Sequence, residues 1–174
     1  MQDLDPGVRT MATFAAGVLA EKADGAAADR ARDSLVRALG DPATDVRWNA
    51  ALGLARLGRT EGADLVWDML HRDYIRANLQ RGDGAAAAGF LGQSGTDTAT
   101  PEQIEERVLL NALSAAWRLK DRSMIEGVGA LAASDPGDGV RDWALRTRGL
   151  LEGEIRDHGP VVARAWPVVG RERR

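Results

Sequence analysis

The chain has 174 residues, of which 44% are hydrophobic and 28% charged, and its formal net charge is -3. This composition is typical of one globular domain with a core, and the negative charge argues against a surface that attracts nucleic acid. Cysteine is absent, which excludes disulfides and thiolate metal sites. The sequence has no apolar run long enough to predict a membrane span. Its N-terminal residues carry acids where a signal peptide carries bases, so we expect a cytoplasmic protein.

The first predicted helix covers residues 5–20, and Asp5 with Pro6 marks its start. An aspartate oxygen accepts hydrogen bonds from the first free backbone N–H groups, and proline at the first helical position loses no bond. Apolar residues at helical spacing predict that one face is buried: Val8, Met11, Ala12, Ala15, Val18 and Leu19. A second amphipathic helix is expected over residues 27–39.

Residues 41–58, DPATDVRWNAALGLARLG, predict the third helix. Asp41 and Pro42 indicate its start, and Gly58 indicates its end. On a helical wheel, five residues fall in one apolar sector: Val46, Ala50, Gly53, Leu54 and Leu57. A fourth amphipathic helix is expected over residues 61–71, so the two helices form a hairpin.

The pattern of residues 41–58 returns elsewhere in the chain. Asp, Pro, a short turn and Val-Arg also open residues 5–20 and 135–152, and a weaker copy covers 108–120. Self-similarity of this kind is the signature of a stacked helical repeat. We therefore expect the landmark valines Val8, Val46, Val108 and Val140 to occupy matching places in successive layers.

Residues 72–100 interrupt this pattern with a segment rich in Gly, Ala, Asp and Thr. We expect a short helix around residues 74–80 and read most of the remainder as an insertion, since a long structureless segment is unusual inside a compact domain. The large gap between Val46 and Val108 agrees with an insertion there.

Regular helices resume after the insertion. Thr100, Pro101 and Gln103 form a predicted capping box at the start of a helix that runs to about Leu119. A shorter helix is expected over residues 122–133, and the last one covers 135–152. The expected inward residues of these helices share the helical period: Ile104, Val108, Ala112, Ala115, Ala116, Leu119, Met124, Ile125, Val128, Leu131, Val140, Ala144, Thr147 and Leu151.

The phrase D-P-x-x-x-V-R-x-x-A-x-x-x-L-x-x-L-G at residues 41–58 resembles the HEAT-repeat family, most closely the short bacterial repeats also seen in phycobilisome lyases. The resemblance covers most of residues 3–152 and is weakest at 108–119, where Leu109 replaces arginine. It implies an all-α fold: an α-solenoid of about seven helices in roughly three and a half repeats. This superhelix would span residues 1–153, with the insertion at 72–100 and a partly extended tail at 154–174.

In HEAT repeats the Val-Arg helix is the second of each pair and lines the concave side. By that register the chain starts on a second helix, so the resemblance implies that this end is capped by something else or continues a longer array. Arg9, Arg47 and Arg141 recur at one position. They form either a basic ladder for an acidic partner or structural ties to the nearby acids, and we favour the structural ties.

Apolar side chains also lie opposite the predicted core face. Trp48 and Leu52 fall on the side of their helix where a surface helix is polar. With their equivalents they define a candidate stripe for binding a partner: Phe14, Trp48, Leu52, Leu110 and Trp117. The alternative is that residues 72–100 or the tail fold over this stripe. Asn49 and Asn111 share one position and either clamp a peptide backbone, as in armadillo repeats, or bond a neighbouring carbonyl.

Residues for catalysis are not evident. His71 and His158 lack a partner at metal-ligand spacing, so neither a metal nor another cofactor is expected. The pattern favours a non-enzymatic scaffold that binds a protein or peptide, as a subunit or accessory of a larger assembly. Nucleic acid is not an expected partner, and two alternatives remain.

The first alternative is a HEAT-like protein resembling DNA glycosylases, with Arg47, Trp48, Trp117 and Asp142 in its cleft. The net charge of -3 disfavours it, because duplex DNA needs a basic surface. The second is a chromophore-handling protein resembling bilin lyases. The absence of cysteine and of catalytic-looking polar residues disfavours that function.

Overall fold

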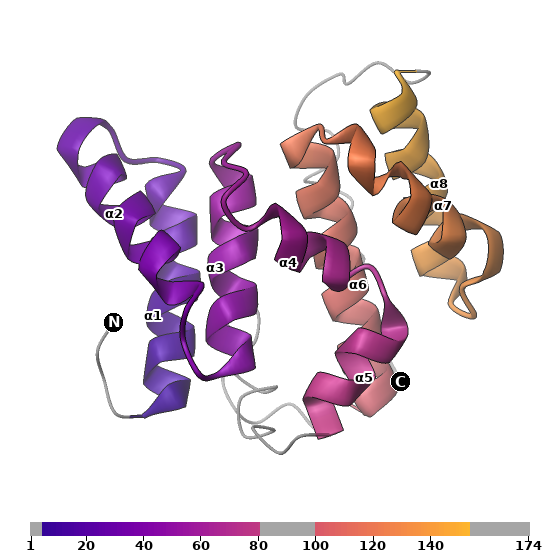
Figure 1. Ribbon diagram of the computed structural model, residues 1–174, viewed down its shortest axis with the longest axis horizontal. Helices are drawn as coiled ribbons and strands as arrows, with labels where there is room; N and C mark the ends of the chain where they lie inside the picture. Colours follow the sequence, from indigo (N-terminus) through magenta and orange to yellow (C-terminus); the bar gives the residue numbers. More distant parts are fainter. Residues whose placement is uncertain (1–4, 81–99, 154–174) are drawn as a thin grey trace, which may run out of the picture.

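The computed structural model describes residues 5–80 and 100–153, and these form helices in two layers (Figure 1). The helices that carry the landmark valines stand side by side, each in contact with the next, and we call them the valine layer: α1 (Pro6–Ala20), α3 (Thr44–Arg56), α6 (Pro101–Leu119) and α8 (Asp138–Glu152). The second layer consists of α2 (Gly25–Ala38), α4 (Ala63–Asp68) and α7 (Ile125–Ser134), which follows the 3₁₀ turn η2 (Arg122–Met124). The predicted all-α, solenoid-like architecture is confirmed.

One further helix, α5 (Arg72–Gln80), packs against α6. It is the short helix expected at the start of the 72–100 segment, and it brings the described α-helices to eight, against about seven predicted. The remainder of that segment, residues 81–99, and the tail 154–174 lie outside the described residues. The division into a 1–153 domain and a tail therefore stays a prediction.

Two helix starts follow the predicted chemistry, and those of α3 and α8 differ: α8 begins at Asp138 rather than at Asp135. Asp5 caps α1, because its Oδ1 accepts hydrogen bonds from the backbone N–H groups of Gly7 at 2.7 Å and Val8 at 3.4 Å. Thr100 and Gln103 form the expected capping box of α6. Asp41 does not cap α3 directly, since α3 begins at Thr44; its Oδ1 accepts from the Ala43 N–H at 2.9 Å and closes the turn before the helix.

The core is centred on α3, which packs against α1, α2, α4 and α6. Eleven of its thirteen residues are buried. A helix enclosed in this way is apolar nearly all round rather than along one stripe. The stripes predicted for α6 and α8 are confirmed at their centres, where Val108, Ala112, Val140 and Ala144 are 0% exposed.

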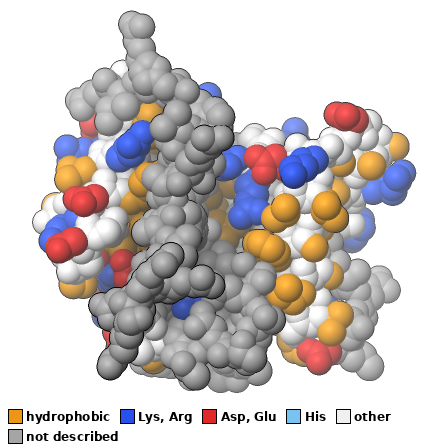
Figure 2. Space-filling view, turned by 180° about the vertical axis from the view of Figure 1, so that it is seen from behind, with side chains coloured by type: hydrophobic (Ala, Val, Ile, Leu, Met, Phe, Trp, Pro, Cys, Tyr) orange, Lys and Arg blue, Asp and Glu red, His pale blue; other side chains and the backbone are white. Residues whose placement is uncertain are grey.

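The buried face predicted for α1 is wrong. Val8, Met11 and Leu19 are 50%, 39% and 66% exposed, and hydrophobic side chains gather over α1 in the view from behind (Figure 2). The residues that α1 buries are Thr10, Thr13, Gly17 and Ala20. Its landmark valine therefore differs in burial from Val46, Val108 and Val140, which are at most 1% exposed.

Close helix packing explains why α1 buries this small, polar-looking face. A Cβ added to Gly17 would lie 2.8 Å from the Cα of Gly53, so α1 and α3 touch backbone to backbone at this crossing. The buried hydroxyls of Thr10 and Thr13 donate to the carbonyls of Pro6 and Arg9, both at 2.8 Å, and so carry little desolvation cost.

Among the described residues, no helix is both long and apolar enough to cross a lipid bilayer.

Candidate partner-binding surface

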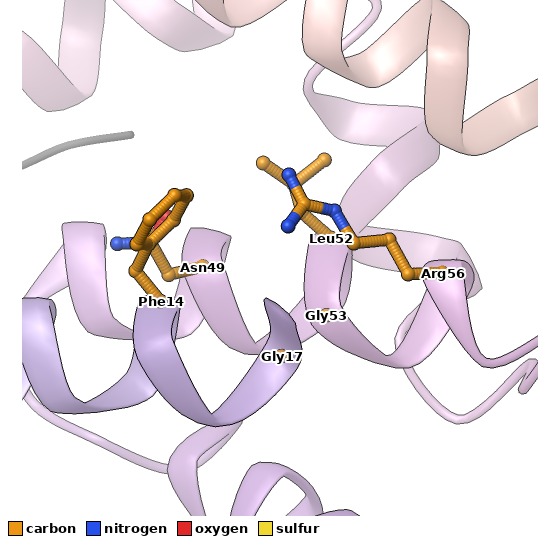
Figure 3. Close-up of a pocket in the computed structure, with 6 residues that line it drawn as sticks. All are labelled: Phe14, Gly17, Asn49, Leu52, Gly53 and Arg56. Carbon is orange, nitrogen blue, oxygen red and sulfur yellow. The ribbon is translucent and has the colours of Figure 1, made fainter. Parts of the chain in front are cut away.

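The candidate surface begins with a shallow recess between α1 and α3, which we call the α1–α3 recess. Its volume is about 10 Å³, room for about one water molecule. Two glycines form its floor and four side chains rise around it (Figure 3): Phe14, Gly17, Asn49, Leu52, Gly53 and Arg56. The structure thus brings together Phe14, Asn49 and Leu52, three of the seven residues predicted to bind a partner.

Arg56 is the residue of this recess that the sequence interpretation missed. Its guanidinium carbon lies 5.6 Å from the centre of the Phe14 ring, a cation–π distance. Burial lowers the pKa of Arg56, repulsion from Arg118 lowers it further, and attraction to Glu21 offsets part of this. Spacing alone offered a signal, because Arg56 stands one helical turn after Leu52 on the same face.

Trp48 does not belong to the surface, so its assignment to the exposed stripe is wrong. The side chain is 0% exposed and sits in the main core. Its ring centre lies 6.3 Å from that of Tyr74 on α5, with the planes tilted by 49°, which is within the usual range for an aromatic pair. Trp48 is therefore a core residue, and the described part of the 72–100 segment contacts it through Tyr74.

The remaining apolar candidates differ in exposure. Leu52 is largely buried at the edge of the recess, whereas Phe14, Leu110 and Trp117 are partly exposed. Leu110 and Trp117 lie on α6, which packs against α3. The apolar part of the predicted stripe that remains accessible therefore consists of Phe14 on α1 with Leu110 and Trp117 on α6.

Both candidate asparagines bond within the chain. The Asn49 Nδ2 donates to the Thr10 carbonyl of α1 at 3.3 Å, and the Asn111 Nδ2 donates to the Arg107 carbonyl at 2.7 Å. These contacts correspond to the second interpretation of the pair, in which each amide satisfies a neighbouring carbonyl. Asn49 ties α3 to α1, whereas Asn111 bonds its own helix.

The repeated arginines make structural contacts. Arg9 holds Asp41 of the next repeat through two hydrogen bonds, Nε to Oδ2 at 2.8 Å and Nη2 to Oδ1 at 2.9 Å. Arg47 donates to the carbonyls of Asp41 and Pro42 at 2.7 Å, and Arg141 donates to the carbonyl of Asp135 in the equivalent turn. The expectation of a tie to an acid of the neighbouring repeat is confirmed for Arg9, whereas Arg47 and Arg141 bond the turns before their own helices.

Position 109 holds leucine where the other repeats have arginine, and Arg72 on α5 makes an equivalent contact instead. Its Nε and Nη2 bond both oxygens of Asp135 at 2.7 and 2.8 Å, which is the arrangement that Arg9 makes with Asp41. Arg72 also donates to the buried Glu105 at 3.1 Å, and Arg76 donates to Glu105 at 2.9 Å. Helix α5 is therefore clamped between α6 and the turn before α8 by a partly buried ion network.

The described residues contain no group of three or more side chains suited to hold a metal ion. His71 stacks on Trp67, with ring centres 3.9 Å apart, and its Nδ1 lies 3.0 Å from the Trp67 carbonyl. Both contacts are structural. Within residues 5–80 and 100–153 the partly exposed aromatic and cationic groups around the recess are thus the feature best suited to recognition.

The comparisons with known proteins agree with this architecture. Residues 1–81 match the family model of HEAT repeats. No curated protein and no solved structure matches the chain. The matched residues contain the first two helices of the valine layer and the helices that pack on them. Through these residues, the N-terminal part of the chain is similar to the HEAT-repeat family.

Proposed function

We propose that this protein is a non-enzymatic scaffold of the cytoplasm that binds a protein or peptide segment, as a subunit or accessory of a larger assembly. HEAT repeats generally act as protein-interaction scaffolds. The binding surface would be the face of the valine layer that carries Phe14, Leu110 and Trp117, which the family register makes the concave one. The observation that carries the proposal is the partial exposure of Phe14 at a recess floored by glycines and of Trp117 on α6, the helix that follows α3 in the valine layer.

The physical basis of this proposal is the binding free energy that buried aromatic side chains contribute. Partly exposed Phe and Trp side chains gain apolar burial when a partner covers them, and such residues dominate binding energies at protein interfaces. By contrast, two of the residues assigned to the cleft of the glycosylase-like alternative are engaged within the protein. Trp48 is buried in the core, and Arg47 donates its guanidinium hydrogens to the carbonyls of its own turn. The bilin lyase-like alternative gains no support from the described residues.

The test is site-specific photo-crosslinking in the intact chain. A photo-reactive residue is placed at Leu110, and a control at the exposed Asp33 of the second layer. We expect a discrete protein adduct from position 110 alone, and we expect the double variant Phe14→Ala, Trp117→Ala to abolish it while the far-UV spectrum is unchanged. Equal adducts from both positions, or an adduct that persists in the folded double variant, would contradict the proposed surface.

A further inference from the structure

Arg56 has unused hydrogen-bonding capacity in a place where arginine is expected to be bonded. The guanidinium carries five N–H donors. Three other partly buried arginines, Arg9, Arg47 and Arg72, each donate to carboxylate or carbonyl oxygens. Within the described part of the chain, Arg56 has no such acceptor, and its one specific contact is with the Phe14 ring. A partly buried cation without an anion carries an uncompensated desolvation cost.

The charges around Arg56 leave this position electropositive. Arg118 on α6 repels the Arg56 guanidinium, and Glu21 at the end of α1 attracts it. Glu21 is already engaged, because its Oε1 accepts a hydrogen bond from Arg118 at 3.1 Å. The three groups together carry one excess positive charge on a chain whose net charge is -3. This arrangement can accommodate one additional carboxylate.

The shape of the recess defines the rest of the ligand. Gly17 and Gly53 bring α1 and α3 so close that the volume beneath the side chains is only about 10 Å³. A bound group therefore rests on the rim rather than inside. The rim offers the Phe14 ring from α1 and the edge of Leu52 from α3, and in Figure 3 the Arg56 guanidinium lies beside Leu52, across from Phe14.

We propose that the α1–α3 recess binds an acidic peptide segment of the partner, in which an Asp or Glu carboxylate pairs with Arg56 and an adjacent apolar side chain packs on Phe14. This inference rests on the proposed function, since it specifies the chemistry of the partner at the same surface. Arginine bonds a carboxylate through two parallel N–H groups, which adds direction to the contact. A nucleic acid is disfavoured, because duplex binding draws on many phosphate contacts and this position offers one excess charge.

The experiment selects short peptides from a random display library against the full chain and measures the affinity of the selected peptides for three proteins: the wild type, Arg56→Gln and Arg59→Gln. Arg59 is a matched control, because it lies just beyond the same helix but pairs with Glu61 at 2.9 Å. We expect selected peptides to carry Asp or Glu next to an apolar residue. Their affinity should fall roughly 10-fold or more in Arg56→Gln and stay nearly unchanged in Arg59→Gln.

Two further variants separate the possible failures. Arg56→Lys keeps the charge but loses the paired donors, so an intermediate affinity is expected. Phe14→Ala reports whether the peptides bind at the recess at all. Peptides that depend on Phe14 but have no acidic preference, or that bind Arg56→Gln normally, would overturn the inference and leave the proposed function standing. Peptides indifferent to Phe14→Ala, or no selected peptides, would overturn both.

Discussion

Two tryptophans on neighbouring helices illustrate how burial decides the role of a residue. Trp48 on α3 is 0% exposed beneath Tyr74, while Trp117 on α6 is partly exposed. Both residues belonged to the stripe that the sequence predicted. The difference arises because Trp48 lies inside the main core, where its ring meets that of Tyr74 on α5. Trp48 is thus a core residue, and Trp117 is the tryptophan available for recognition.

The consequence for stability can be measured directly. Trp48→Ala should lower the free energy of unfolding by about 3–5 kcal/mol, because it leaves a cavity in a close-packed core. Trp117→Ala should cost less, about 1 kcal/mol, since water already reaches part of its ring. Urea unfolding followed by circular dichroism compares the two. A Trp48→Ala protein as stable as the wild type would mean that α5 does not cover this ring in solution.

At the scale of the helix, α1 shows where sequence periodicity is ambiguous. Its apolar residues recur at helical spacing and yet face solvent, while Thr and Gly residues form the buried face. Hydrophobic spacing identifies a face relative to the helix's own axis. It does not show which neighbour that face meets. Here the close crossing at Gly17 and Gly53 places the small residues against α3.

Equivalent valines of the repeat provide a matched test. Val46 is 1% exposed and packs with Ala38, Ala43 and Ala50, whereas Val8 is 50% exposed. Val46→Ala should lower the free energy of unfolding by about 2 kcal/mol through the lost methyl burial. Val8→Ala should change it by less than about 0.5 kcal/mol, because alanine also favours the helix. Similar losses at both positions would indicate that α1 is covered.

At the scale of the whole molecule, two equivalent ion pairs join successive repeats: Arg9 with Asp41 and Arg72 with Asp135. In each, the aspartate also closes its own turn through a backbone N–H. Burial alone raises the pKa of both aspartates, but the hydrogen bonds and charges of the arginines outweigh it, so each pKa lies below its ordinary value. A repeat array depends on such nearest-neighbour contacts for its cooperativity.

The depressed pKa values predict acid sensitivity. A carboxylate with a lower pKa in the folded state adds stability that is complete above its unfolded pKa, near 4, and is lost as pH falls through the folded pKa. Below about pH 4 the wild type should therefore lose stability more steeply than the double variant Asp41→Asn, Asp135→Asn. At pH 7 the single variant Asp135→Asn should lose about 3 kcal/mol, because Arg72 is left partly unpaired.

Chemical denaturation over a series of pH values measures both effects. Some acid dependence should remain in the double variant, because hydrogen bonding from Arg59 lowers the pKa of Glu61 to about 2. Identical pH profiles for the wild type and the double variant would contradict the structural role of the two pairs.

The sequence by itself determined the repeat and most of its helices. The Asp-Pro and Val-Arg phrases, the capping box at Thr100 and the apolar period of α6 and α8 depend on contacts within a few residues, which local spacing encodes. It also placed Phe14, Asn49 and Leu52 on one surface, because equivalent positions of a repeat fall on equivalent faces. These local rules were sufficient for the solenoid-like fold.

Only the tertiary structure decided which of those surfaces are covered. Arg72 replaces the missing arginine at Leu109 by reaching Asp135, 63 residues away in sequence. Trp48 is buried in a core that several helices share, with its ring near Tyr74 of the apparent insertion. Arg56 meets Phe14 because two glycines let α1 and α3 approach. Each of these contacts depends on how whole helices stack, and hydrophobic periodicity along one helix carries no information about its neighbours.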